Sequence, residues 1–292
     1  MKDQLTRLII NNEVRVMASD TTHLVEEAKA IHKTFPVATA VLGRTLTAAV
    51  MMGSELKHPS HSLTININGG GPAGTVLATA KGDCTVRGCM GNPQVNLPAR
   101  SDGKLDVGGA VGKDGFLTVI RDVGLKDAYV GKTELRSGEI AEDLAYYFLQ
   151  SEQQPSIVYL SVWVDIDTSV LRAGGLIISP MPGASEETLS DIESRLFDIQ
   201  NYAMLLLSKS PAEAVKTIFA GMDVKELDTR EPRYHCDCSR EKLEQVIISL
   251  GREEITDMIE KDGQAEIVCR FCNKKYLFDA EALRRLLQEA TH

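Results

Sequence analysis

Two closely spaced pairs of cysteines constrain this chain more than any other feature. Cys236 and Cys238 form a C-x-C pair, 30 residues follow, and Cys269 and Cys272 form a C-x-x-C pair. Two such pairs on tight turns can place four sulfur atoms at the corners of a tetrahedron, about 2.3 Å from a Zn²⁺ ion. We therefore predict one zinc ion per chain, bound by these four thiolates in the reduced state. Four thiolates leave no open coordination position, which argues against hydrolytic zinc catalysis.

The segment that carries these cysteines is small enough to depend on a metal. Residues 232–292 are predicted to form a helix after Ser239 that stops at Gly251, two short strands and a final helix after Asp279. A piece of about 60 residues buries only about 60% of its unfolded surface and is marginally stable alone. Zinc supplies on the order of 10–16 kcal/mol of folding free energy in small metal domains, against about 5–15 kcal/mol for a typical whole domain. Loss of the metal should therefore unfold this segment.

The four-cysteine pattern leaves two interpretations open. A site of this kind is most often a permanent structural clip. The alternative is a redox switch, because thiolates can be oxidised to sulfenic acids and then to disulfides, which do not ligate zinc as thiolates do. Each cysteine has a neighbour in its own motif whose thiol could attack the sulfenic acid and form a disulfide. His235 adjoins the first pair, but with four cysteines present we expect it outside the ligand set.

The rest of the chain predicts an α+β fold with three parts. Residues 1–180 read as a core domain of antiparallel strands and helices, including helices near 21–34, 36–52 and 139–150 and an alternating strand at Leu63, Ile65 and Ile67. Residues 181–231 read as a helical and charged linker, with one long helix over 186–207 and a second helix after the Ser210-Pro211 cap. Residues 222–234 are short of apolar side chains, so we expect a weakly held segment there. Residues 232–292 form the zinc domain.

Other motifs carry no chemistry of their own. A G-x-G-x-x-G pattern occurs at Gly69, Gly71 and Gly74, but the residues after it read as a strand, so we expect a hairpin turn rather than a dinucleotide site. We expect Cys84 and Cys89 to be buried, inert thiols. The spacing provides no phosphate-binding loop and no catalytic set of Ser, His, Cys or Asp. We therefore expect a protein that is not an enzyme.

Composition and charge indicate the compartment and partners. The chain has 292 residues, of which 43% are hydrophobic and 25% charged, as in ordinary globular proteins. Its net charge of −9 disfavours a broad surface for nucleic-acid phosphates. Residues 1–10 lack the features of a secretory signal, and no apolar run approaches the roughly 18 residues of a membrane-spanning helix. We expect a cytoplasmic protein in which cysteines are thiols or metal-bound thiolates.

Several motifs, taken together, resemble one known family. The resemblance covers nearly the whole chain and is carried by residues 236–241, 269–272 and 276–278, with weaker signatures at 147–155 and 173–182. The chain is similar to the redox-regulated chaperones of the heat-shock protein 33 family, also called 33-kilodalton chaperonins. The paired cysteine motif is the specific part of this resemblance.

The resemblance implies an ATP-independent holdase that binds unfolding proteins during oxidative stress and passes them to downstream foldase chaperones. It implies an inactive, reduced form with zinc on Cys236, Cys238, Cys269 and Cys272. Oxidation would join Cys236 to Cys238 and Cys269 to Cys272, release zinc, unfold the C-terminal segment, destabilise the charged linker and expose client-binding surface. The resemblance also implies a homodimer in the active state.

Two alternatives remain open on the sequence. A zinc-ribbon module could bind nucleic acid, but residues 232–292 contain 10 basic and 12 acidic residues, a balance of −2, and the remainder has 22 against 29, a balance of −7. A thiol-disulfide oxidoreductase could use Cys269 and Cys272, but the chain lacks the βαβ context of thioredoxin-like proteins around that motif.

Overall fold

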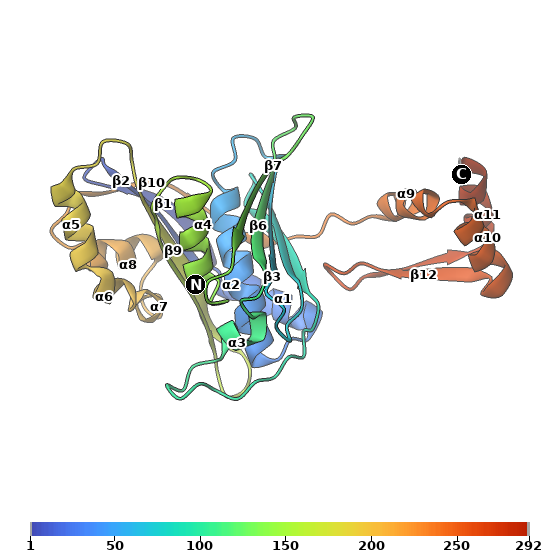
Figure 1. Ribbon diagram of the computed structural model, residues 1–292, viewed down its shortest axis with the longest axis horizontal. Coiled ribbons are helices and arrows are strands. Elements are labelled where there is room, and N and C mark those ends of the chain that lie inside the picture. The colour runs from blue at the N-terminus through green and yellow to red at the C-terminus, as the bar shows by residue number, and fades with distance from the viewer. Residues whose placement is uncertain (1, 291–292) are drawn as a thin grey trace. The chain divides into compact units, whose positions relative to one another are not determined.

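The computed structural model describes residues 2–290 and divides into two compact units (Figure 1). The contacts separate the chain between His235 and Cys236, rather than between 231 and 232 as the sequence suggested. The first unit has two sheets, and the second contains one small hairpin with three helices. Helices and antiparallel strands occur in both units, so the α+β class predicted from the sequence is confirmed.

The first unit has four layers: an outer layer of helices, the five-stranded sheet, a central layer of helices and the six-stranded sheet. The five-stranded sheet has the order β10-β1-β2-β9-β8, formed by β10 (Val224–Arg230), β1 (Gln4–Ile10), β2 (Val14–Asp20), β9 (Val170–Pro180) and β8 (Ile157–Val164). The six-stranded sheet has the order β11-β5-β4-β3-β6-β7, formed by β11 (Arg233–Tyr234), β5 (Thr85–Met90), β4 (Val76–Lys81), β3 (Ser62–Asn68), β6 (Phe116–Asp122) and β7 (Tyr129–Glu134). All neighbouring strands are antiparallel except β11, which runs parallel to β5.

The central layer contains the core helix. α2 (Pro36–Gly53) contacts strands of both sheets, and α4 (Ala141–Gln150) contacts β7 and β8 from opposite sheets (Figure 1). α1 (Thr22–His32) packs on α2 and β9, and α3 (Val107–Val111) lies against α2. Among the described residues, α2 alone is long and apolar enough to cross a bilayer, and 89% of that stretch is buried within the unit. Such burial is typical of a core helix in a packed domain.

The glycine-rich segment after β3 forms a turn, as predicted. β3 and β4 pair antiparallel, with Ile67 opposite Val76 at the end of the hairpin. A Cβ atom on Gly69 would lie 2.3 Å from the carbonyl oxygen of Gly112, and one on Gly71 would lie 2.4 Å from that of Ala110. These glycines therefore allow close approach to α3, and the segment precedes a strand instead of the helix that a dinucleotide site requires.

The segment 181–231 differs from the predicted linker. The single helix expected over 186–207 is replaced by three shorter helices, and all the helices of this segment pack on the outer face of the five-stranded sheet: α5 (Glu186–Ser194), α6 (Leu196–Ile199), α7 (Tyr202–Leu205) and α8 (Pro211–Ile218). The expectation of a weakly held segment over 222–234 is wrong for β10, which pairs with β1 along its length. Backbone pairing and ion pairs hold this strand, and neither requires apolar side chains.

The second unit is built around a small core of its own. It contains α9 (Arg240–Leu250), α10 (Arg252–Lys261), β12 (Gln264–Val268), β13 (Lys275–Asp279) and α11 (Ala280–Glu289). Ser239 and Asp279 accept hydrogen bonds as the N-caps of α9 and α11, and Gly251 separates α9 from α10. The predicted caps, strands and terminal helix are confirmed, and α10 is an additional helix. The core is centred on a few fully buried side chains: Ile247, Ile255, Phe278 and Leu283.

Candidate metal centre

The second cysteine pair lies in the tight turn between β12 and β13. The amide of Cys269 donates to the carbonyl of Lys274 at 3.0 Å, which closes the hairpin end. The amides of Cys272 and Asn273 donate to the carbonyl of Cys269 at 3.3 and 2.8 Å, and Asn273 has a left-handed φ of 56°. This turn fixes the backbone so that both sulfurs of the C-x-x-C motif can face one point.

The first cysteine pair immediately precedes α9. The hydroxyl of Ser239 accepts the amide of Lys242 at 3.3 Å and fixes the start of the helix. The ammonium of Lys242 donates back to the carbonyl oxygen and a carboxylate oxygen of Asp237, at 2.8 and 3.0 Å. These contacts hold the extended C-x-C segment against the helix, next to the β12–β13 turn.

The four sulfurs converge on a space of the size that zinc requires. The Sγ atoms of Cys236 and Cys269 are 3.7 Å apart, those of Cys238 and Cys272 are 3.3 Å apart, and all four lie within 4.8 Å of one another. Ligands at about 2.3 Å in a tetrahedron are separated by about 3.8 Å. The four cysteines could therefore hold a metal ion. Cys269 is buried and the other three are half-buried.

Burial and shared hydrogen bonds shift the pKa values of three of these thiols in different directions. Burial tends to raise the pKa of Cys238, but hydrogen bonds from Tyr276 and from the other thiols outweigh it and lower this pKa to about 7. Burial and the hydrogen bond with Cys238 raise the pKa of Cys272 to about 12. Burial also raises the pKa of Cys236. Among these three thiols Cys238 therefore loses its proton first, and metal binding must displace the protons of Cys236 and Cys272.

Tyr276 is a contact of this site that the sequence did not predict. Its hydroxyl lies 3.3 Å from Sγ of Cys238 and 3.2 Å from the carbonyl oxygen of the same residue. The hydrogen bond to Cys238 raises the pKa of the phenol to about 12. The available sequence signal was its place in β13, seven residues after Cys269, where a strand could return a side chain to the turn.

The remaining candidates lie apart from the cluster of sulfurs. His235 donates its backbone amide to the carbonyl of Val86 at 2.9 Å and is outside the group of ligand atoms that converge in the described chain. Cys84 is buried in a left-handed turn, and burial raises the pKa of its thiol. Cys89 is half-buried on β5, so the expected burial is confirmed for Cys84 and wrong for Cys89. Their inertness stays a prediction.

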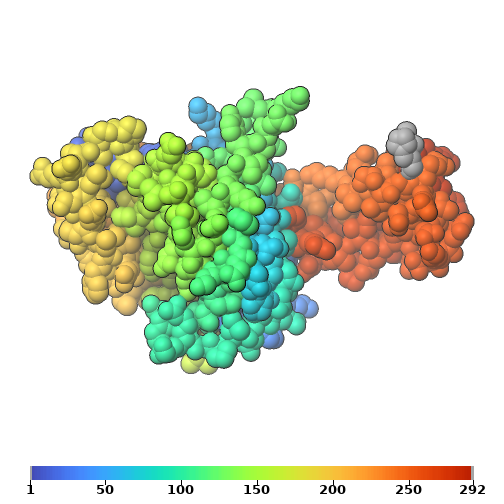
Figure 2. Space-filling view, in the orientation of Figure 1, coloured from blue at the N-terminus to red at the C-terminus, as the bar shows by residue number. Residues whose placement is uncertain are grey.

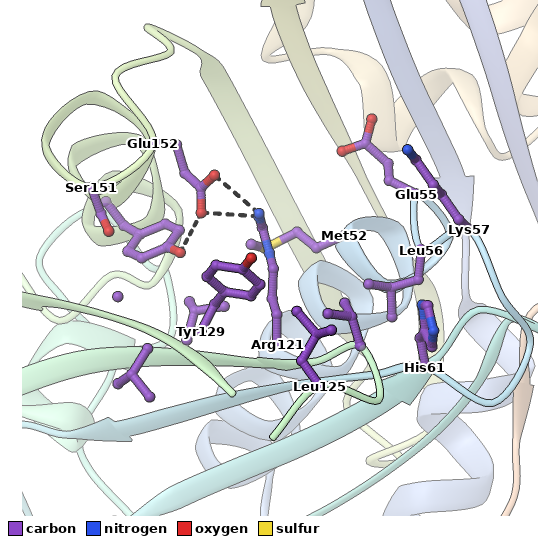
Figure 3. Close-up of a pocket in the computed structure, with 15 residues that line it drawn as sticks. Met52, Glu55, Leu56, Lys57, His61, Arg121, Leu125, Tyr129, Ser151 and Glu152 are labelled. Carbon is purple, nitrogen blue, oxygen red and sulfur yellow. Dashed lines mark hydrogen bonds and ion pairs between the residues drawn. The ribbon is translucent and has the colours of Figure 1, made fainter. Parts of the chain in front are cut away.

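A second concave site lies in the first unit, at the C-terminal ends of α2 and α4 (Figure 3). Its volume is about 690 Å³. Arg121 of β6 approaches both carboxylate oxygens of Glu152 at 3.0 Å, and the hydroxyl of the buried Tyr147 donates to the same carboxylate at 2.5 Å. Leu125 and Tyr129 are about 60% exposed at the rim, where the β6–β7 turn projects from the unit (Figure 2). Because these charges satisfy one another, the cluster ties α4 to β6.

Comparison with known proteins decides the family. The family model described as Hsp33 protein matches residues 3–279, which include both cysteine pairs and extend from the first unit into the second. The chain belongs to the Hsp33 family. Relatives named 33 kDa chaperonin include one from Clostridium perfringens, 49% identical over 99% of this chain and 92% of that protein. Another, from Alkaliphilus metalliredigens, is 46% identical over 96% of each chain.

A solved structure agrees with this assignment. The crystal structure of a 33 kDa chaperonin from Thermotoga maritima, a heat shock protein 33 homologue, matches with a TM-score of 0.90 and 37% identity, covering 99% of this chain and 98% of that one. The family resemblance expected from the sequence is confirmed. Membership of the Hsp33 family supports a chaperone function, and the four close cysteines are compatible with zinc binding.

Proposed function

We propose that this chain is a redox-regulated, ATP-independent holdase whose reduced form binds zinc and is inactive. The observation that carries the proposal is the convergence of Cys236, Cys238, Cys269 and Cys272 in a unit whose core contains few large side chains. When bound, zinc would cross-link the turn before α9 to the β12–β13 turn. Because a unit of this size is marginal alone, its folded state would depend on these four thiolates.

The switch is a four-electron oxidation. Two molecules of peroxide would take four electrons in total, two from each sulfur pair. With four protons taken up from solvent this gives two disulfides and four molecules of water, and the zinc ion would leave with its charge unchanged. In the reduced cluster the sulfurs in closest contact belong to different motifs: Cys236 with Cys269, and Cys238 with Cys272. Once the unit unfolds, the short loops within each motif keep only the sequence neighbours close. This supports disulfides joining Cys236 to Cys238 and Cys269 to Cys272.

The partners follow from the holdase activity. Oxidation would destabilise the neighbouring segment and expose surface for unfolding client proteins, which downstream foldase chaperones would then receive. The active form would be a homodimer in the cytoplasm, with no role for nucleic acid or membranes and no catalytic turnover. The net charge of −9 supports the expectation that nucleic acid is not a partner.

The test combines native mass spectrometry with a client aggregation assay. Reduced protein should contain one zinc ion, and peroxide at raised temperature should yield two disulfides, zinc loss and stoichiometric suppression of aggregation. A double variant, Cys84→Ser with Cys89→Ser, is the matched control and should switch normally.

Full activity with zinc bound and all four thiols reduced would exclude the switch. Catalytic turnover of a disulfide substrate by zinc-free protein would favour an oxidoreductase, and a salt-dependent shift with single-stranded RNA would favour a nucleic-acid module.

A further inference from the structure

Strand β8 forms one edge of the five-stranded sheet. It pairs with β9 alone, from Ile157 opposite Ile178 to Trp163 opposite Arg172, and the register shifts only after Trp163. In an antiparallel pair, every second residue turns its amide and carbonyl away from the neighbouring strand. Within residues 2–290, no backbone hydrogen bond outside this ladder involves β8. A row of backbone donors and acceptors is therefore available to a further strand.

The side chains of β8 distinguish it from the other edges of the two sheets in the first unit. β10 carries a Lys, a Glu, an Asp and an Arg among its seven residues, β7 carries Lys132 and Glu134, and β11 is two residues long. Charge and shortness are common means by which edge strands avoid pairing with other chains. β8 is eight residues long and contains no charge, proline or glycine. Its composition therefore favours pairing.

The edge of β8 lies in a groove of about 710 Å³. Residues 158–164 line the groove along the strand, which is about 20 Å at 3.3 Å per residue. The loop 100–105, Arg44 of α2 and Glu139 also line it. Glu139 pairs with Arg44 at 2.7 Å and with Arg100 at 2.9 Å, so these charges satisfy one another. The groove therefore fits about six residues of extended, uncharged chain.

The occupant that suits this groove is a single strand rather than a second copy of the protein. The central residues of the edge, Leu160, Ser161 and Val162, are 5%, 8% and 5% exposed, so the edge is recessed among the residues that line the groove. A second copy would present the same recessed edge, and two recessed edges cannot approach to the roughly 4.8 Å that separates paired strands. An extended polypeptide segment can enter the groove and pair along the edge.

We propose that the edge of β8 is a binding site for an extended polypeptide segment with uncharged, β-branched side chains, which joins the five-stranded sheet as a sixth strand. The inference goes beyond the proposed function, because the site lies wholly in the first unit and requires neither zinc loss nor oxidation. One short strand is a small contact. The site therefore holds a segment of a partner without replacing the surface that oxidation would expose.

The test uses the reduced, zinc-loaded protein and a capped peptide, acetyl-KTVTVTVK-amide, whose charges lie at its ends. Trp163 is the single tryptophan of the chain and lines the groove, so its fluorescence reports binding. Hydrogen exchange of the amides in 157–163 should slow in the complex, whereas exchange in β7 should not. In the control peptide the two central residues are N-methylated. Because adjacent residues point to opposite edges, neither edge can then pair, and the affinity should fall at least about tenfold.

Two variants place the site on β8. Val158→Lys puts a charge in the groove, where strand pairing would bury it, and should weaken binding of the first peptide about tenfold. Leu227→Lys adds the same charge to β10, the opposite edge of the same sheet, at a residue that is 60% exposed. It should change the affinity by less than about twofold. The comparison of the two peptides uses the wild-type protein, so the test does not depend on whether Val158→Lys folds.

Equal affinity for the two peptides, or binding that leaves exchange of 157–163 unchanged, would overturn the inference. So would fluorescence of Trp163 that changes with protein concentration while the peptide stays unbound, because a second copy would then occupy the edge. This inference and the proposed function can fail separately. Zinc loss and disulfide formation under peroxide test the switch, whereas peptide binding by the reduced protein tests the edge of β8.

Discussion

Strand β10 should open from the first unit more often when a single carboxylate is neutralised. Asp228 accepts hydrogen bonds from the guanidinium of Arg7 on β1 at both oxygens, and from Arg230 at 2.9 Å. β10 is an edge strand with one neighbour, so this cluster is a large part of what holds it. The Asp228→Asn variant keeps the shape but removes the charge.

The expected magnitude follows from the exposure of the cluster. The side chains of Arg7, Asp228 and Arg230 are 34%, 31% and 35% exposed, so solvent screens each ion pair. An exposed pair contributes about 0.2–1 kcal/mol, and a paired arrangement around one carboxylate should reach about 1–2 kcal/mol in total. The opening equilibrium of β10 should therefore rise about 5–30-fold in Asp228→Asn.

Native-state hydrogen exchange of the amides in residues 224–230 measures this opening directly. The matched control is Asp223→Asn, which removes an ion pair with Lys225 beside the same strand, where the two side chains are 57% and 52% exposed. That variant should change exchange by less than about twofold. Equal effects of the two substitutions, or no change in Asp228→Asn, would refute the reasoning.

The same cluster sets a pH dependence. The hydrogen bond from Arg7 lowers the pKa of Asp228 in the folded protein. A carboxyl with a depressed folded pKa contributes stability that is complete above its unfolded pKa of about 3.9 and is lost as pH falls through the folded value. Local opening of β10 should therefore increase below about pH 4 in the wild-type protein, and Asp228→Asn should abolish this part of the dependence.

Three further outcomes test other parts of the structure. Chelation of zinc from the reduced protein should abolish the protection of amides in α9, α10 and α11 but leave β2 and β9 protected; a folded metal-free second unit would contradict this. Tyr147→Phe removes the donor to Glu152 and should lower the free energy of unfolding of the first unit by about 1.5–3 kcal/mol in urea titrations. Gly131→Ala would place a Cβ atom 2.4 Å from Oγ of Ser151 and 2.7 Å from the buried ring of Tyr147, so a loss of about 1–3 kcal/mol is expected by the same measurement.

The candidate site was predicted more fully than the fold around it. The four cysteines, the cap at Ser239 and the hairpin between the last two strands follow from short-range spacing, and the structure brings the four sulfurs together. The contact between Tyr276 and Cys238 was missed because 38 residues separate them and only the folded hairpin joins them.

The strands of the five-stranded sheet show why prediction of the first unit was incomplete. β1 and β2 were missed, although Asn11 and Asn12 have the left-handed backbone typical of a tight hairpin turn and separate two apolar strands. β10 was expected as a weakly held segment because its side chains are polar and charged. Its partner β1 is more than 200 residues away in the chain, so no local pattern could have revealed the pairing.

The sequence by itself predicted the four candidate cysteine ligands, the family and the smallness of the second unit, because each depends on short motifs whose order and spacing can be read along the chain. Only the tertiary structure decided which distant groups complete these local elements. The first turn of α1 shows the difference: Thr21 makes no capping hydrogen bond through its side chain, and the carboxylate of Asp3, which lies just before β1, accepts the amides of His23 and Leu24 instead. Spacing fixes what a segment can form, whereas packing decides which side chain satisfies the polar groups left free at its ends.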